Sequence, residues 1–522
     1  MYSAKKITTH GQNTWVIPVA FFSILVVIIT AVILHLNDGR FIYTLDDPYI
    51  HLALAENIIQ GHYGVNLSEF SAPSSSILWP FLLAPFAQTT IGEYLPFIIA
   101  FGSCIAIIIL FCSMLYGFAK RTFKSDILPR AAYYFIVAAG CAMPILVNLA
   151  GLTFIGMEHA LQALCAIAVV AAFLKEYDEE VFPWWGIAGI LIGPLVRYEN
   201  AALSFLAIAV LFFQGRKQLA VVCFVFIIST LVAFSLFLHN LDLGFLPSSI
   251  VAKSRLQPRG VFPFSVIRSF ASNLIKPQGL PFILGLILIL LKIRVKEFRN
   301  IIILVAGAVL AHFAVGDILG RRYTAYMGVM LLLTVLFLYR DSIGEFLPHA
   351  SQIMKAAVIL FIVIATGTLI ITETALTPIA SNNLYEQQYQ MHRLAKLYNK
   401  PVAINDLGFV SFRNNNYVLD LWGLASLKAL KLRTNATSAE WPDTLCREHN
   451  AELVMIYDTW FPQVPTAWIR VGDITLSREK VAPDGKRVTF YAINQSAKTS
   501  IVPVLHRFKT MLPNRVKINI YE

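Results

Sequence analysis

Charged residues are scarce in this chain: Asp, Glu, Lys and Arg make up 14% of its 522 residues, while hydrophobic residues make up 57%. A soluble domain carries about 25% charged residues, so the composition excludes an ordinary soluble protein. Cysteine is also rare, at six residues, with neither a CxxC pair nor the Cys/His spacing of a metal site. This excludes a disulfide framework. The chain is therefore expected to be a polytopic membrane protein.

Long apolar runs dominate residues 1–378 and predict an all-α membrane domain with about eleven spanning helices. Several runs are shorter than the roughly 20 residues that cross a bilayer, so we expect tilted or partial spans that line a cavity. The candidates are Trp15–Leu36, Leu95–Phe118, Ala131–Ala150, Met157–Leu174, Trp184–Val196, Ala201–Phe213, Leu219–His239, Leu280–Leu291, Ile301–Val315, Tyr323–Tyr339 and Ile353–Thr374.

The distribution of lysine and arginine predicts the orientation of these spans. Cytoplasmic loops carry the excess of such residues. The larger share falls on the side of Lys5 and Lys6, so we expect a cytoplasmic N-terminus. The loop of residues 37–94 then lies outside, and an odd number of spans places residues 379–522 outside as well.

Residues 379–522 predict a mixed α/β domain outside the membrane. Glu386–Leu397 has the pattern of a helix, and short apolar runs indicate strands. These runs are Pro401–Ile404, Tyr417–Leu419, Leu453–Tyr457 and Val488–Ile493. The candidates for stacking against a ligand are Trp422, Tyr457, Trp460 and Trp468, although aromatic rings in such a domain belong more often to its core.

Two adjacent acids, Asp46 and Asp47, follow the first apolar run at the point where the chain should leave the bilayer. Carboxylates in or beside a membrane are costly, which makes them candidates for function. In the alternative interpretation they cap the helix that begins near Pro48. His51, about one turn beyond Asp47, is expected to be a hydrogen-bonding partner in the same site.

The predicted outer loop of residues 240–278 carries basic residues on the side of the membrane where they should be rare. Lys253 and Arg255 are its best candidates for binding a lipid-linked phosphate, because Lys and Arg form charge-assisted hydrogen bonds with phosphate. Attraction to anionic lipid headgroups is an equally good explanation.

Other charged residues lie at predicted helix ends and complete the candidate substrate site. Glu158 could contact substrate or pair with His159 or a neighbouring helix, and Arg197 and Glu199 could contact substrate or pair with each other. Arg321 and Arg322 are candidates for phosphate, with Asp317 to orient them.

The first-loop sequence D-D-P-Y-I-H-L-A-L-A-E-N, followed by G-H-Y-G-V-N and S-A-P-S-S-S-I-L-W, resembles the first extracytoplasmic loop of GT-C glycosyltransferases. The likeness is greatest to the bacterial arabinofuranosyltransferase-like branch. Further similar segments are Gly156–Ala160, Leu195–Asn200, Ala252–Ser254, Gly316–Tyr323, Ala403–Val410 and Val418–Leu424.

The resemblance implies a GT-C-like fold and transfer of a sugar from a polyprenyl-phosphate donor. The acceptor would be a cell-envelope glycan, a glycolipid or a protein outside the bacterial inner membrane, and no nucleic-acid partner is expected. A carboxylate of the first loop would act as base, and we place Asp46 in this role and keep Asp47 in the site. A base is needed because the acceptor hydroxyl loses its proton as it attacks, whereas the phosphate leaving group needs only cations.

The chain departs from the family pattern near two of these positions. R-Y-E-N at Arg197 replaces the usual Arg-Pro-Glu, and G-M-E-H at Gly156 replaces Gly-Leu-Glu-Thr. The identity of the sugar therefore does not carry over. Some GT-C enzymes use a divalent cation and others do not, so the sequence leaves the metal open and predicts no other cofactor.

Two functions of other classes fit the composition. A transporter or flippase of lipid-linked substrates would place charges near broken helices, but no repeat of the helical pattern is evident. A non-catalytic membrane protein with an outer domain would not need paired acids opposite a basic loop.

Overall fold

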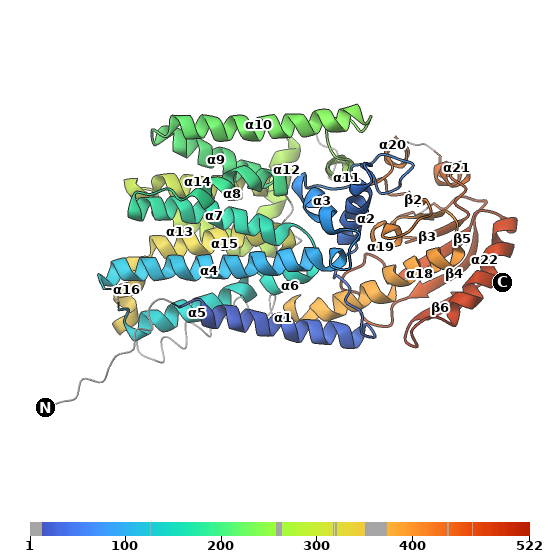
Figure 1. Ribbon diagram of the computed structural model, residues 1–522, viewed down its shortest axis with the longest axis horizontal. Coiled ribbons are helices and arrows are strands. Elements are labelled where there is room, and N and C mark those ends of the chain that lie inside the picture. The colour runs from blue at the N-terminus through green and yellow to red at the C-terminus, as the bar shows by residue number, and fades with distance from the viewer. Residues whose placement is uncertain are drawn as a thin grey trace.

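The computed structural model describes residues 13–125, 127–256, 264–316, 318, 321–349, 373–435, 438–461 and 463–522. A bundle of apolar helices is joined to a smaller unit built around a sheet (Figure 1). The predicted combination of a helical membrane domain with a C-terminal mixed α/β domain agrees with this architecture at the level of the two units.

Five helical segments among the described residues are long and apolar enough to cross a membrane: Val16–Leu36, Gly92–Phe123, His159–Glu179, Lys217–Asn240 and Lys296–Val315. Three bent pairs bring the total to eight if each pair is one span. Eleven spans are therefore not confirmed. The candidates Trp184–Val196 and Ala201–Phe213 correspond to helices of 13 and 14 residues, and Ile353–Thr374 lies mostly outside the described residues.

The bundle contains, in chain order, α1 (Val16–Leu36), α4 (Leu95–Phe123), α5 (Arg130–Leu146), α6 (Leu149–Ile155), α7 (His159–Glu179), α8 (Trp184–Val196), α9 (Asn200–Phe213), α10 (Lys217–Asn240), α11 (Ser248–Leu256), α12 (Phe264–Ile275), α13 (Leu280–Leu290), α14 (Arg299–Val315), α15 (Arg321–Leu338) and α16 (Arg340–His349). Short 3₁₀ turns cover Ala84–Phe86, Gly92–Tyr94, Pro277–Gly279 and Lys296–Phe298. Helix α7 is the most buried of the five long segments, whereas α10 exposes most of its apolar side chains, as expected for a surface in contact with lipid.

The loop after α1 folds into α2 (Asp47–Ile59) and α3 (Leu78–Leu83). Figure 1 shows α2, α3 and α11 between the bundle and the sheet. Helix α2 begins at Asp47 because Pro48 occupies its first turn, where a proline costs no hydrogen bond. Ile50, Ala53 and Val65 of this loop belong to the same buried apolar cluster as the sheet, so the first loop is part of the outer unit's core.

The outer unit is a six-stranded sheet in the order β2-β1-β3-β5-β4-β6. β1 (Val402–Ile404) pairs in parallel with β2 (Val418–Asp420) and β3 (Leu453–Ile456). The other pairs, which involve β4 (Ile469–Thr475), β5 (Arg487–Ala492) and β6 (Lys517–Ile520), are antiparallel. Residues 373–386 are helical, followed by α18 (Gln388–Tyr398), α19 (Gly408–Ser411), α20 (Leu427–Asn435), α21 (Trp441–Glu448) and α22 (Gln495–Lys509).

The predicted boundary between residues 378 and 379 falls inside the helix of residues 373–386. This helix contacts the end of α1 and the start of the first loop through Asn382, whose Nδ2 donates to the backbone oxygen of Leu36 (3.0 Å) and to Asn37 Oδ1 (3.1 Å). The division at this boundary stays a prediction.

Candidate active site

The first acid of the loop, Asp46, connects it to the outer unit. Its side chain is 7% exposed, and its two carboxylate oxygens accept backbone hydrogen bonds from Gly408 (2.5 Å) and Phe409 (2.8 Å). A side chain at position 408 would place its Cβ 2.6 Å from the carboxyl carbon of Asp46, so only glycine allows this approach. Asp46 occupies the N-cap position of α2 but makes no capping hydrogen bond with its side chain. The acid therefore contacts the outer unit and does not cap its own helix.

A second, half-buried carboxyl group, Asp406, lies beside Asp46 and hydrogen-bonds to it. Asp406 follows β1 and accepts hydrogen bonds from Gln388 Nε2 (2.7 Å) and the Tyr457 hydroxyl (3.3 Å). Burial, together with repulsion from other carboxylates, raises the pKa of both acids. Sequence reasoning did not single out Asp406, although two signals marked it: it lies in a turn directly after a predicted strand, and within the family-like segment Ala403–Val410.

The Asp46–Asp406 pair predicts a pH dependence that can be measured. Because the folded-state pKa of both acids is raised, the folded protein holds a proton that the unfolded chain releases above about pH 4. The stability from this proton is complete below about pH 4 and is lost as the pH rises through about 6, the raised pKa of Asp406. Asp406→Asn removes one of the two like charges, so we expect its unfolding temperature at pH 8 to exceed the parent's by about 2–4 °C.

Thermal unfolding of the full chain between pH 5 and pH 8 measures this difference, which should shrink towards pH 5. Glu479→Gln is the matched control, because this acid of the outer unit is exposed. If both variants changed the unfolding temperature by the same amount at every pH, this would contradict a proton shared by Asp46 and Asp406.

The second acid, Asp47, faces the bundle. Its side chain is 37% exposed and forms an ion pair with Arg322 of α15, with 3.0 Å between Asp47 Oδ2 and Arg322 Nη1. Arg322 also donates a hydrogen bond to the Tyr323 hydroxyl (2.8 Å), and its guanidinium lies 4.8 Å from that ring's centroid. His51 lies four residues further along α2 and is buried. The structure thus joins an accessible carboxylate of the first loop to a cation at the start of α15.

A buried ion network lies at the break between α8 and α9. The Arg197 side chain is 4% exposed and contacts Glu158 Oε1 at 2.6 Å and Glu199 Oε1 at 2.6 Å. Its Nη1 also donates to Ser75 Oγ of the first loop at 3.4 Å. The Arg197–Glu199 ion pair, one of the two roles predicted for these residues, is present, and Glu158 pairs with Arg197 from the start of α7.

The ring of Tyr323 lies between the Asp47–Arg322 ion pair and the buried network around Arg197. The Arg197 guanidinium lies 5.4 Å from the ring's centroid, and the His159 ring packs edge-on at 5.2 Å. Two arginines from segments far apart in the sequence, Arg197 and Arg322, therefore lie beside one tyrosine. Their acidic partners, Glu158, Glu199 and Asp47, lie around the same ring. Tyr323 was not among the residues that the sequence singled out, although it directly follows Arg321 and Arg322 and ends the family-like segment Gly316–Tyr323.

The remaining candidates are placed only in part. Lys253 and Arg255 lie in α11 and Arg321 begins α15, but their side chains lie outside the described residues, as does the whole of Asp317. Helix α11 does contact the first loop, because Ser248 Oγ donates to the backbone oxygen of Ala72 at 2.8 Å.

Among the side chains that the structure describes, no three His, Cys, Asp or Glu residues gather as a metal-ligand set. Asp317 lies outside that search. A divalent cation stays an open prediction, and no chemical step below depends on one.

Comparisons with known proteins find one family model and a solved structure that are similar to this chain. The model of the family described as a domain of unknown function (DUF8728) matches residues 381–491, and no curated protein matches the chain. Among solved structures, the chain is similar to the crystal structure of the Archaeoglobus fulgidus oligosaccharyltransferase complex with zinc and sulfate. The TM-score is 0.46 and the identity 12%, over 95% of this chain and 74% of the other. The function proposed below rests on the residues where the first loop, the bundle and the outer unit meet.

Proposed function

We propose that this protein is a membrane glycosyltransferase that moves a sugar from a polyprenyl-phosphate donor to an acceptor outside the bacterial inner membrane. The acceptor is a cell-envelope glycan, a glycolipid or a protein. The observation that carries the proposal is the partly exposed Asp47 carboxylate, paired with Arg322 where the first loop, the bundle and the outer unit meet. This arrangement provides a base and a cation within one site.

Asp47 is the better candidate for the base, although the sequence favoured Asp46. Both oxygens of Asp46 already accept backbone hydrogen bonds, and the side chain is buried. Asp47 is accessible, and its carboxylate lies beside the Arg322 guanidinium, with 3.0 Å between Oδ2 and Nη1. In this proposal Asp46 positions the loop and Asp47 performs the chemistry.

The reaction requires one proton transfer and one displacement. Asp47 accepts the proton of the acceptor hydroxyl as its oxygen attacks the anomeric carbon. The bond from that carbon to the phosphate oxygen breaks, and the phosphate leaves as an anion. Arg322 lies beside the carboxylate and stabilises the negative charge that develops on the phosphate. Glu158 and Glu199 hold Arg197, whose guanidinium lies 5.4 Å from the centroid of the Tyr323 ring against which Arg322 packs.

The outer unit offers an aromatic surface for the acceptor. Trp422 and Trp460 lie 4.3 Å apart between ring centroids and are both half-buried, with the Arg433 guanidinium 3.7 Å from the Trp422 ring. Tyr457 is buried, and Trp468 is buried with its Nε1 bonded to Asp443 (2.9 Å), so these two rings belong to the core. Trp422 and Trp460 therefore remain as candidates for stacking against a sugar.

Transfer of radiolabelled sugar tests the proposal. Purified protein is given a panel of polyprenyl-phosphate monosaccharides together with membrane glycolipid and polysaccharide fractions, beside a double variant with Asp46→Asn and Asp47→Asn. Transfer by the parent alone would support the proposal and identify the donor. Absence of transfer with every donor, from folded protein that binds none of the carriers, would favour the transporter or non-catalytic alternative.

A further inference from the structure

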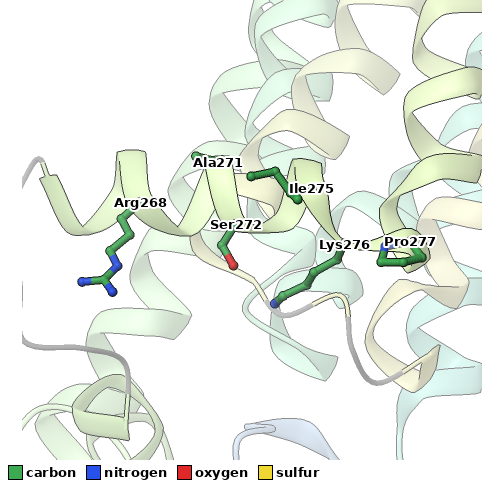
Figure 2. Close-up of a pocket in the computed structure, with 6 residues that line it drawn as sticks. All are labelled: Arg268, Ala271, Ser272, Ile275, Lys276 and Pro277. Atoms are coloured by element: carbon green, nitrogen blue, oxygen red, sulfur yellow. The ribbon is translucent and has the colours of Figure 1, made fainter.

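Segments that are far apart in the sequence converge on the Asp406 carboxyl group at the end of β1. Gln388 begins α18, Tyr457 directly follows β3, and Asp46 precedes α2. Each of these three side chains lies within hydrogen-bond distance of Asp406. An open cavity of about 580 Å³ beside α12 differs in this respect, because its six described lining side chains all come from residues 268–277 (Figure 2). The cluster around Asp406 therefore joins elements that meet only through folding, and one of them is the first loop.

The hydrogen bonds of Asp46 favour its ionised form. Its Oδ2 accepts from the amide of Gly408 at 2.5 Å, and its Oδ1 accepts from the amide of Phe409 at 2.8 Å. Backbone amides that donate to both oxygens of a carboxylate stabilise the charged form. Asp46 is therefore the acceptor within the pair, and the hydrogen bond between the two acids requires a proton on Asp406.

The hydrogen bonds of Asp406 leave one oxygen for that proton. Its Oδ2 accepts from Gln388 Nε2 at 2.7 Å and lies 3.3 Å from the Tyr457 hydroxyl. The same hydroxyl accepts from Gln388 Nε2 at 2.8 Å and contacts Gln387 Oε1 at 2.6 Å, so these groups hold one another in place. A protonated carboxyl group accepts at one oxygen and donates from the other. Since Oδ2 is the accepting oxygen, Oδ1 is the oxygen that carries the proton.

Two further acids act on Asp406. Asp47 of α2 and Asp484 of the β4–β5 loop both repel a negative charge on its carboxyl group. His392 of α18 packs against the Phe409 ring with 5.4 Å between the ring centroids, and burial lowers the pKa of this histidine to about 4. It is therefore neutral above that pH. A proton on Asp406 thus removes one of several neighbouring negative charges and also supplies the hydrogen bond to the first loop.

We propose that Asp406 is a positioning residue: as a neutral acid it donates a hydrogen bond to Asp46 and so holds the first loop, with Asp47, in place. Because Asp47 is the next residue along the chain, a displacement of Asp46 moves it directly. Gln388 and Tyr457 orient the Asp406 carboxyl group. The expected effect on sugar transfer rests on the function proposed above, whereas the attachment of the loop is measured without it.

Hydrogen–deuterium exchange of the full chain measures this attachment, because the amides of Gly408 and Phe409 donate to Asp46. At pH 5 we expect the peptide with these amides to exchange at least about tenfold faster in Asp406→Ala than in the parent, since a hydrogen bond to a charged group is lost. Asp406→Asn keeps a donor that does not titrate. Its exchange should equal the parent's at pH 5 and be slower than the parent's at pH 8, above the raised pKa of Asp406, about 6.

The matched control is Asp458→Ala. Asp458 is another acid that follows a strand of the same sheet, and it accepts hydrogen bonds from Thr489 Oγ1 (2.8 Å) and the Tyr491 hydroxyl (2.9 Å), both on β5. Its loss removes an acid and two hydrogen bonds from the outer unit without touching the Asp406 cluster. We expect the exchange of the same peptide to stay within about twofold of the parent's, the size of a surface effect.

Sugar transfer under saturating donor measures the consequence for the reaction. Asp406→Ala should lower kcat at least about tenfold and leave the KM for the donor within about twofold, because a misplacement of a catalytic group by about 1 Å can cost about 10²-fold. Asp406→Asn should match the parental kcat at pH 5 and exceed it at pH 8.

Unchanged exchange or a parental kcat in Asp406→Ala would overturn the proposal. If this variant does not fold, Asp406→Asn decides alone, and a ratio to the parent that is the same at pH 5 and pH 8 would overturn the proposal. A parent that transfers no sugar, in a series that shows the expected changes in exchange, would contradict only the function proposed above.

Discussion

Replacing Asp47 by asparagine is expected to slow sugar transfer by ~10²- to 10⁴-fold, the range typical for loss of a general base. Asparagine keeps the shape of the side chain but cannot accept the proton of the acceptor hydroxyl. Since Asp47 is partly exposed at the edge of the junction, the substitution should leave the fold intact. The rate is measured under saturating donor, with the sugar that the panel identifies.

Asp46→Asn is the informative control for this experiment. In the parent the Asp46 carboxylate accepts hydrogen bonds from the amides of Gly408 and Phe409. For Asp46→Asn we therefore expect weaker docking of the outer unit and a smaller loss of transfer rate than for Asp47→Asn. A parental rate in Asp47→Asn, with a large loss in Asp46→Asn of unchanged stability, would return the role of base to Asp46.

Replacing Arg197 by methionine is expected to destabilise the protein by roughly 3–5 kcal/mol, because it leaves a buried charge without its partner. The Glu158 side chain is fully buried and contacts Arg197 at 2.6 Å. Methionine fills part of the volume but supplies neither charge nor donor. Unfolding by titration with SDS, starting from mixed micelles, measures the loss.

The matched control is Arg216→Met, which removes an arginine whose ion pair with Glu176 is partly exposed. We expect that change to cost at most about 1 kcal/mol. The double variant Glu158→Gln with Arg197→Met should be less destabilised than the sum of its single changes, because the unpaired charge of the fully buried Glu158 is gone and only the partly exposed Glu199 remains. Equal losses in Arg197→Met and Arg216→Met would show that the network contributes little to stability.

The first loop packs against the outer unit, although the two are far apart in the sequence. Asn66 in this loop exchanges hydrogen bonds with Val418 of β2, at 3.0 Å and 2.9 Å, and Tyr417 donates to Glu69 at 2.6 Å. Together with the contacts of Asp46, these bonds make the loop and the sheet one packed unit. Movements of the outer unit should therefore also move Asp47.

The sequence by itself determined the local elements. Apolar runs such as Val16–Leu36 must be helical in lipid, because no water is present to satisfy the backbone. Pro48 placed the start of α2, and short buried runs correctly indicated β1, β2, β3 and β5. Strands β4 and β6 were not predicted. Gly472 and Asp473 interrupt the apolar pattern of β4, and β6 alternates between exposed and half-buried residues.

Only the tertiary structure decided what each charged residue does. Adjacent acids with the same local signal have opposite environments: Asp46 contacts amides more than 360 residues away, and Asp47 contacts Arg322. Likewise Tyr323 became the centre of the site only because α7, α8 and α15 pack together. The physical reason is that helix formation depends on groups near in sequence, whereas the charge and pKa of a carboxyl group depend on burial and on partners brought close by packing.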